Sequence, residues 1–327
     1  MDDTLPAASA RRSRLSWIFV GDDGLRAGWS ILLFVLLTVL TIMALVIAVR
    51  LLAPTLLHRP HGEATFGPVA VSEILMLLGV GVPAFIMTFV ERRPFARYNV
   101  GGGNRIAAFA KGLASGLVML SVLVGLIAAT GSISFQGMAI GGGAIVTFGI
   151  EWLIAFLLVG MFEEFGFRGY LQFTLARGVA GVARRLGADK ARAGSIGFWV
   201  AAVALSLFLF AFVHTTNGGE TPMGIAAVGL AGLTFAFSLW WTGSLWWAIG
   251  FHAAWDWSQS YLYGVADSGL VSQGRLLITH PVGNVLLSGG TTGPEGSVLV
   301  IPVMLASMAL VWRTMPRRLP PVVDGRA

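Results

Sequence analysis

The chain has 327 residues, of which 56% are hydrophobic and only 12% are charged. Soluble proteins carry about a quarter charged residues, so this composition indicates an integral membrane protein. The formal net charge of +6 comes from arginines that lie between long apolar segments, so it does not indicate nucleic-acid binding. The chain contains no cysteine, which excludes disulfides, thiolate nucleophiles and cysteine metal ligands.

The first 27 residues are polar and are expected to form a cytoplasmic tail. They contain Arg11-Arg12-Ser13-Arg14, and paired arginines before an apolar segment also occur in twin-arginine export signals. The apolar segment here begins some fifteen residues later and is longer than that of a signal peptide. A helix that stays in the membrane is therefore the preferred interpretation.

Eight apolar segments follow, and most of them have the roughly 20 residues that a helix needs to cross a bilayer. They lie at about 29–53, 67–91, 106–130, 144–168, 194–214, 222–241, 243–263 and 297–315. We therefore predict an all-α, polytopic bundle of about eight transmembrane helices. Residues 28–315 would form a single transmembrane domain, and 1–27 and 316–327 would be its tails.

The distribution of basic residues predicts the orientation of the bundle. Arginine and lysine gather in both tails and in the connectors 92–105 and 177–192. The alternate connectors contain only three arginines, which are Arg50, Arg59 and Arg275. The positive-inside rule therefore places both termini in the cytoplasm, and we expect the protein in a bacterial plasma membrane.

The fourth apolar segment is expected to extend beyond 168. If it ended there, Glu163 would lie at the cytoplasmic face, about 30 Å from His214 at 1.5 Å per residue. The two residues come closer if the helix continues through Ala176 to a membrane edge near Arg177, with Arg168 inside the membrane. We expect a kink at one of three glycines, Gly166, Gly169 or Gly178.

Ionisable residues are costly inside a membrane, so those in apolar segments indicate function. Six of them form the candidate site: Glu163, Glu164, Arg168, His214, His252 and Asp256. Glu164 and Arg168 are four residues apart, so they are predicted to pair on one helix face. That pairing leaves Glu163 in a different environment, which is how neighbouring carboxylates divide acid and base roles. The alternatives are glutamates that only brace the bundle and histidines that only make structural hydrogen bonds.

The other ionisable residues in or near apolar segments are less informative. His58 and His280 lie in connectors and are expected to be solvated. Lys111 is expected to extend its amine to the inner interface. Glu73 and Glu151 stay open between structural polar groups and residues along an entry path.

The ordered motifs Glu163-Glu164-x-x-x-Arg168, Phe210-x-x-x-His214 and His252-x-x-x-Asp256 resemble the signature of the CPBP intramembrane proteases. This family includes the type II CAAX prenyl endopeptidases and proteins related to bacteriocin immunity and lysostaphin resistance. The resemblance covers about 145–260, which would be the protease core. Each motif is weak by itself, but three in the right order on three apolar segments are specific.

The resemblance implies an intramembrane endopeptidase, of either the glutamate-dependent or the metalloprotease type. Its substrates would be membrane-associated or lipidated proteins or peptides. Glu163 and His214 would activate a water molecule that attacks the peptide carbonyl. Glu164 and Arg168 would orient the first motif.

The resemblance leaves the roles of His252 and Asp256 open between oxyanion stabilisation and metal binding. Family members often carry asparagine at position 256, and an aspartate donates a hydrogen bond only when it is protonated. Asp256 therefore favours a metal ligand, a partner of His252 or a protonated acid. The family has been described both as metalloproteases and as metal-independent glutamate proteases, so the cofactor is either a divalent metal such as zinc or none. The ligands of a metal would be Glu163, His214, His252 and Asp256.

Two other functions remain open from the sequence. A non-catalytic membrane adaptor or bacteriocin-immunity-type protein would keep the fold and bind a partner. A transporter would also contain buried charges, but no matching halves are visible. The presence of all six motif residues favours the peptidase, whose expected partners are the lipid bilayer and a membrane-associated protein or peptide. The sequence does not predict the oligomeric state.

Overall fold

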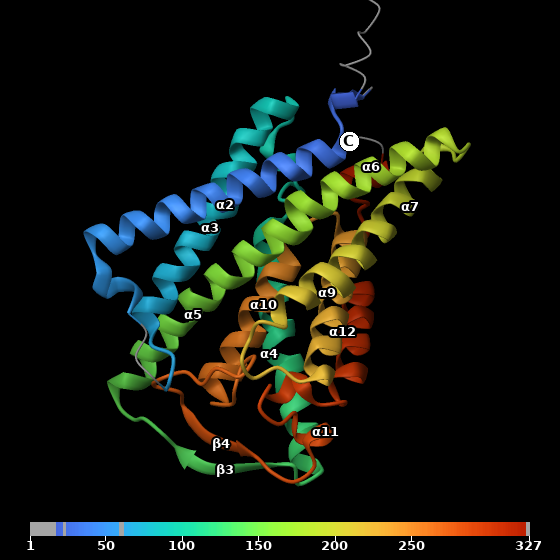
Figure 1. Cartoon of the computed structure of the whole chain (residues 1–327). Coiled ribbons are helices and arrows are strands. Elements are labelled where there is room, and N and C mark those ends of the chain that lie inside the picture. Colours follow the sequence, from blue (N-terminus) through green and yellow to red (C-terminus); the bar gives the residue numbers. More distant parts are fainter. Residues whose placement is uncertain (1–17, 22–23, 59–61, 325–327) are drawn as a thin grey trace, which may run out of the picture.

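The computed structural model describes residues 18–21, 24–58 and 62–324, which form a bundle of long helices with little sheet (Figure 1). Six helices in this part of the chain are long and apolar enough to cross a membrane. They are α2 (Ala27–Leu52), α3 (Phe66–Glu91), α4 (Arg105–Ala129), the continuous helices Gly143–Arg185 and Lys190–His214, and α9 (Pro222–Thr242). The predicted polytopic helical bundle is therefore confirmed.

Two further helices complete the set that the sequence predicted. Helix α10 (Trp246–Trp257) continues into a π-helical segment, η5 (Ser258–Leu262), and α12 (Val300–Thr314) is apolar but only 15 residues long. Helix α12 begins at Val300, slightly after the expected start near 297. Residues Pro294–Gly296 form a 3₁₀ turn, η6, and the Ser297 hydroxyl donates to the carbonyl of Leu287 at 2.7 Å. This turn delays the beginning of the helix.

The remaining elements are short. Strands β1 (Val20–Gly21) and β2 (Gly24–Leu25) pair with each other, as do the antiparallel strands β3 (Ile133–Met138) and β4 (Leu277–Pro281). The connectors contain η1 (Pro54–Leu57), η2 (Phe95–Arg97) and α11 (Val285–Ser288), and the chain ends in α13 (Pro321–Asp324).

The fourth predicted span is part of one helix of 43 residues, from Gly143 to Arg185. It consists of α5 (Gly143–Glu163), the π-helical segment η3 (Glu164–Leu171) and α6 (Gln172–Arg185). The predicted extension beyond Arg168 is therefore confirmed. The helix is irregular at the π-helical segment, which contains Gly166 and Gly169, and the expected kink stays a prediction. Such π-helical segments are frequently found at functional sites.

Close packing by glycines fixes α10 against α4. A Cβ atom on Gly112 of α4 would lie 2.2 Å from the carbonyl oxygen of Trp247, and one on Gly250 of α10 would lie 2.3 Å from that of Phe109. Only glycine fits at such distances, and small residues are the usual means of close helix approach in membranes. The contact brings α10 into the centre of the bundle, together with the third motif.

The two ends of the bundle differ in character (Figure 1). The α6–α7 turn, the connector after α3, strands β1 and β2, and α13 lie at one end, where Arg177 donates to the carbonyl of Leu25 and α13 packs against α7 (Lys190–Val203). Strands β3 and β4 lie at the other end. We call these the arginine-rich end and the strand end. Of the predicted tails and basic residues, 1–17, 22–23, 325–327 and Arg59 lie outside the described residues.

Candidate active site

The π-helical segment positions the first motif. Glu163 is the last residue of α5 and Glu164 the first of η3. The Arg168 guanidinium donates from Nη1 to Glu164 Oε1 at 2.9 Å, and the two side chains are only 1% and 0% exposed. The ion pair predicted from the spacing is therefore present, and it is fully buried. Such charge-assisted bonds are short and strong in an apolar interior.

Aromatic rings and a glycine enclose Arg168. Its Cζ atom lies 4.1 Å from the ring centroid of Phe210 and 5.6 Å from that of Phe235. A Cβ atom on Gly232 of α9 would lie 2.7 Å from Arg168 Nη2, so a larger residue there would push against the guanidinium. The arginine thus connects the first motif to the second through Phe210, by packing and by cation–π attraction.

His252 is the centre of the cluster of charged groups. Its Nδ1 atom lies 3.1 Å from Glu164 Oε1, and its Nε2 atom lies 3.5 Å from Asp256 Oδ2 and 3.8 Å from Glu163 Oε2. The ring also stacks on Phe235, with centroids 5.2 Å apart. Donation from Nδ1–H to Glu164 fixes the ring and directs Nε2 toward the other two carboxylates.

His214 enters the same region from another wall. It ends α8 (Ala211–His214), which continues from the π-helical segment η4 (Ala204–Phe210). Its Nδ1 atom lies 2.8 Å from the carbonyl oxygen of Phe210, and the two rings are in contact. Donation from Nδ1–H to this carbonyl leaves Nε2 as the atom that faces the cavity.

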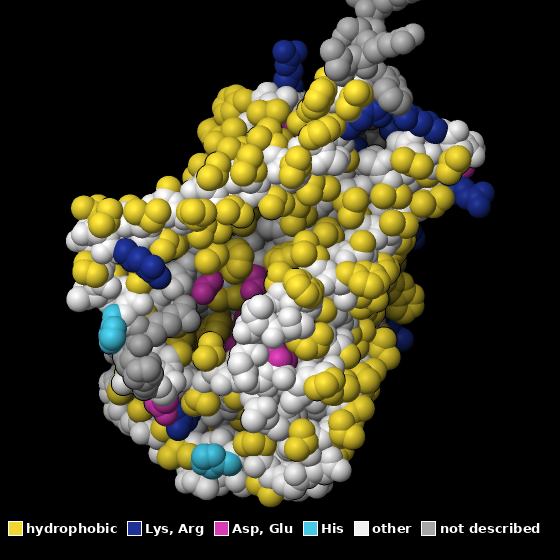
Figure 2. All heavy atoms as spheres, in the orientation of Figure 1, with side chains coloured by type: hydrophobic (Ala, Val, Ile, Leu, Met, Phe, Trp, Pro, Cys, Tyr) yellow, Lys and Arg dark blue, Asp and Glu magenta, His cyan; other side chains and the backbone are white. Residues whose placement is uncertain are grey.

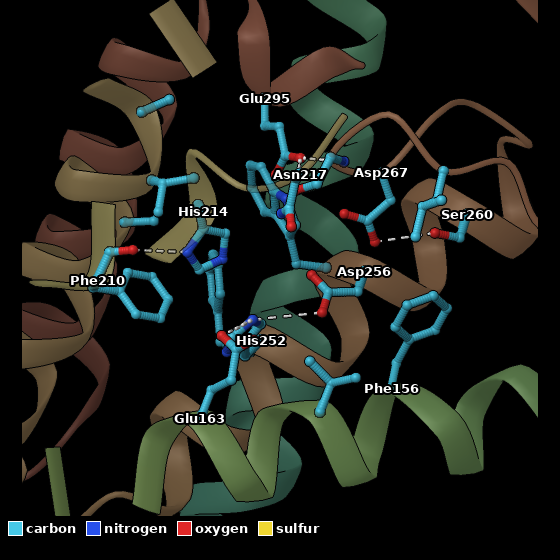
Figure 3. Close-up of a pocket in the computed structure, with 18 of the residues that line it drawn as sticks. Phe156, Glu163, Phe210, His214, Asn217, His252, Asp256, Ser260, Asp267 and Glu295 are labelled. Atoms are coloured by element: carbon cyan, nitrogen blue, oxygen red, sulfur yellow. Dashed lines mark hydrogen bonds and ion pairs between the residues drawn. The ribbon is translucent and has the colours of Figure 1, made fainter. Parts of the chain in front are cut away.

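The motif residues meet at a cavity of about 260 Å³. Figure 3 shows that Glu163, His214, His252 and Asp256 all point into it, from α5, α8 and α10. Much of the wall is apolar, with Phe156, Val159, Phe210, Phe235, Phe251 and Trp255. This volume has room for several water molecules. Five of the cavity's polar groups are carboxylates: Glu73, Glu163, Asp256, Asp267 and Glu295.

The structure also shows site residues that the sequence reasoning missed. The Asn99 side chain donates from Nδ2 to the carbonyl oxygen of Arg168 at 2.8 Å. The backbone carbonyl of Asn99 accepts from the N–H of Leu245, just before α10. Asn99 therefore links the first motif to the third. Asp267 and Glu295 come from the long connector after η5, where neither hydropathy nor a motif distinguishes them from solvated loop residues. Spacing alone gives no signal for any of these three residues.

The other ionisable residues considered from the sequence can now be placed in the structure. Glu73 lines the cavity, which favours the entry-path interpretation, whereas Glu151 does not line it. His58 and His280 are exposed, as predicted. Lys111 donates to the carbonyl of Thr314 at 3.0 Å, near the arginine-rich end.

The carboxylates at the mouth of the cavity hold protons more tightly than free acids. Burial, together with the nearby Asp267 and Glu220, raises the pKa of Glu295 to about 8. Burial also raises the pKa of Asp267 to about 6, although its bond from the Ser260 hydroxyl works in the opposite direction. The N–H and the hydroxyl of Ser268 donate to Glu295, at 2.9 and 3.3 Å.

These pKa shifts predict how the stability of the folded protein depends on pH. A carboxyl whose pKa rises on folding stabilises the fold while it is protonated, and that contribution is lost as pH rises from about 4.5 to about 8. We expect Glu295→Gln, which keeps an acceptor for Ser268, to raise the unfolding temperature by a few degrees at pH 9. It should have no effect at pH 4.5. Thermal unfolding in detergent at both pH values is the measurement, and an equal shift at both would contradict the prediction.

A metal ion does not fit the described residues. In 18–21, 24–58 and 62–324, no group of three or more histidine, aspartate and glutamate side chains is arranged to hold one. The ligand set considered from the sequence, Glu163, His214, His252 and Asp256, is thus not assembled as a metal site. The chemistry proposed for the site is accordingly built on these side chains alone.

The fold and the site together define a helical membrane protein with a buried glutamate–histidine cavity. A model of the family described as Rce1-like, type II CAAX prenyl endopeptidase Rce1-like, matches residues 145–258. This region begins in α5, ends in η5 and contains all six motif residues. Residues 145–258 are therefore similar to this family, and the resemblance seen in the motifs is confirmed. No curated protein and no solved structure matches the chain.

Proposed function

We propose that the protein is an intramembrane endopeptidase that hydrolyses peptide bonds with a water molecule activated by Glu163 and His214. The observation that carries the proposal is that, within the described part of the chain, one carboxylate oxygen of Glu163 has no hydrogen-bond donor. Its Oε2 atom is buried and has no hydrogen-bond donor among the described residues, although the side chain points into a cavity that two histidines line. A buried carboxylate oxygen without a donor is costly, and a water or substrate donor in the cavity would satisfy it.

Glu163 is suited to the role of general base. A water bound to Oε2 would lie in the space that His214 Nε2 faces, so the carboxylate would accept its proton while the imidazole orients it. The resulting hydroxide adds to the carbonyl carbon of the substrate. The proton then passes to the leaving amine as the carbon–nitrogen bond breaks. The apolar walls keep bulk water away and strengthen each of these interactions.

His252 and Asp256 are suited to stabilising the oxyanion. The bond from Nδ1–H to Glu164 holds the ring, so a proton on Nε2 would be directed at developing negative charge. Asp256 lies beside this nitrogen and could donate to the oxyanion when protonated. Glu164 accepts from both His252 and Arg168, so we assign this pair a positioning role.

Purified protein tests the proposal directly. Wild type in detergent is incubated with a membrane-anchored reporter peptide, with and without a chelator, and the products are identified by mass spectrometry. We expect two fragments from one cleaved bond, with one oxygen of the new carboxyl group derived from labelled water. Intact reporter under all conditions would favour the non-catalytic adaptor instead.

Substitutions at Asp256 separate the two roles considered for it. Because an amide can donate to an oxyanion, we expect Asp256→Asn to keep activity within about tenfold of wild type. Asp256→Ala removes the donor, and loss of one such donor typically lowers kcat by about 10²–10³-fold. The measurement is the cleavage rate of each purified variant, which distinguishes a hydrogen-bond donor from a required carboxylate at position 256. If the asparagine variant is as inactive as the alanine variant, a carboxylate is required at this position.

A further inference from the structure

The cavity that holds Glu163 extends toward the strand end of the bundle. Several of its lining residues come from connectors at the strand end, among them Ala64, Asn217, Asp267, Leu270 and Glu295. Figure 2 shows a hollow that contains acidic side chains, below the end that carries most of the visible arginines and lysines. One cavity is thus lined both by Glu163 and by connectors of the strand end.

Aromatic side chains separate the site from the opposite end. Beyond Glu163, the long helix carries Phe165, Tyr170 and Phe173, and these three are 6%, 0% and 1% exposed. Tyr98 from the connector after α3 packs on Tyr170 with centroids 4.9 Å apart, and Phe34 of α2 stacks on the other side at 4.0 Å. Close-packed layers of this kind leave no room for a peptide.

A buried polar cluster fixes this aromatic layer. The hydroxyls of Tyr98 and Tyr170 donate to the carboxylate of Glu91, at 3.0 and 3.3 Å. Arg177 donates to the same carboxylate at 3.4 Å and to the carbonyl of Leu25. Bonded and buried in this way, the layer is part of the fold rather than a mobile cover.

The closed end is also the basic end. The helix ends on either side of the α6–α7 turn carry Arg184, Arg185, Lys190 and Arg192, and basic residues also follow α3 and α12. The strand end has few basic residues in the described chain, and Arg275 there is paired with Glu63. Short connectors rich in arginine and lysine stay in the cytoplasm.

We infer that the catalytic cavity is entered from the non-cytoplasmic side of the membrane. The substrates, given the proposed peptidase function, are then peptide segments that emerge from the bilayer on that side, such as the juxtamembrane part of an exported or membrane-anchored protein. A carboxyl-terminal segment in the cytoplasm would face the arginine-rich end, where the aromatic layer blocks its path to Glu163.

The absence of cysteine from the chain makes a single-cysteine test possible. Leu270 at the mouth of the cavity and Leu186 at the α6–α7 turn are exposed, by 55% and 83%. Each is replaced by cysteine in the full chain. Cells whose outer envelope is permeabilised but whose plasma membrane is intact are then treated with a membrane-impermeant polyethylene-glycol maleimide. We expect Leu270→Cys to be labelled without lysis and Leu186→Cys only after lysis. The reverse pattern would overturn the inference.

A second measurement tests whether the substrate reaches the catalytic residues through the strand end. We expect the attached polymer to abolish most reporter cleavage in Leu270→Cys, relative to the same variant without label. The label on Leu186→Cys should leave its rate unchanged. Reversed labelling of an active enzyme refutes the inference but not the peptidase. The same holds if the label on Leu270→Cys does not slow cleavage. The expected labelling without any cleavage in wild type refutes the peptidase but leaves the orientation established.

Discussion

Glu163→Gln is expected to abolish peptide-bond hydrolysis while the bundle stays assembled. Glutamine has the same shape but cannot accept a proton, and general-base catalysis contributes about 10²–10⁴-fold to the rate. The measurement is the cleavage rate of a membrane-anchored reporter by the purified variant. Glu151→Gln provides a matched control, because Glu151 lies on the same helix and does not line the cavity. Its rate should equal that of wild type.

Combined substitutions test whether the three motifs act as a unit. His214→Ala and His252→Ala should each lower the rate about as far as Glu163→Gln. Double variants should then lose little more, because the effects of residues that serve one step are not additive. Full activity in Glu163→Gln would refute the water-activation mechanism and move the adaptor function to first place. Rates that fall multiplicatively in the double variants would separate the three residues into independent roles.

The sequence predicts the helices well because the bilayer imposes a simple rule. A spanning helix needs about 20 apolar residues, and the chain interrupts its apolar segments with glycine, proline and arginine. Each of the eight predicted segments overlaps a helix in the structure. The length of α12 was predicted less well, because the hydrogen bond from Ser297 that delays its start does not change hydropathy.

The six motif residues could be found because charge inside an apolar segment is conspicuous. The conflict between a short fourth span and the position of His214 also correctly indicated a longer helix, which runs to Arg185. The π-helical register of Glu164–Leu171 could not be predicted, because hydropathy does not report which carbonyl each N–H reaches. This register belongs to the very segment that holds Glu164 and Arg168.

Other parts of the site depend on contacts between elements that are distant in sequence. Gly232 matters because α9 passes close to Arg168, and Asn99 because it reaches the carbonyl of the same residue. Asp267 and Glu295 matter because their connector folds back over the cavity. A single sequence contains no signal for these contacts, since nothing in the local pattern states which helix lies next to which.

Arg168→Ala is expected to lower the stability of the whole bundle. The substitution leaves Glu164 buried without its cation, and breaking a buried ion pair in this way typically costs about 3–5 kcal/mol. The contact with Phe210 is lost as well. We expect a lower unfolding temperature and less monodisperse protein in detergent. Arg185→Ala, at an exposed position in the same long helix, should change stability by no more than about 0.5 kcal/mol.

The double variant Glu164→Gln, Arg168→Met separates the structural role of the pair from its catalytic role. It replaces two buried charges by a neutral amide and an apolar side chain, so much of the lost stability should return. Activity should not return with it, because the neutral amide oxygen of glutamine accepts from His252 Nδ1–H more weakly than the charged carboxylate does. Recovery of both stability and cleavage would show that the pair serves only the fold. Wild-type stability in Arg168→Ala would show that the ion pair does not contribute to the stability of the fold.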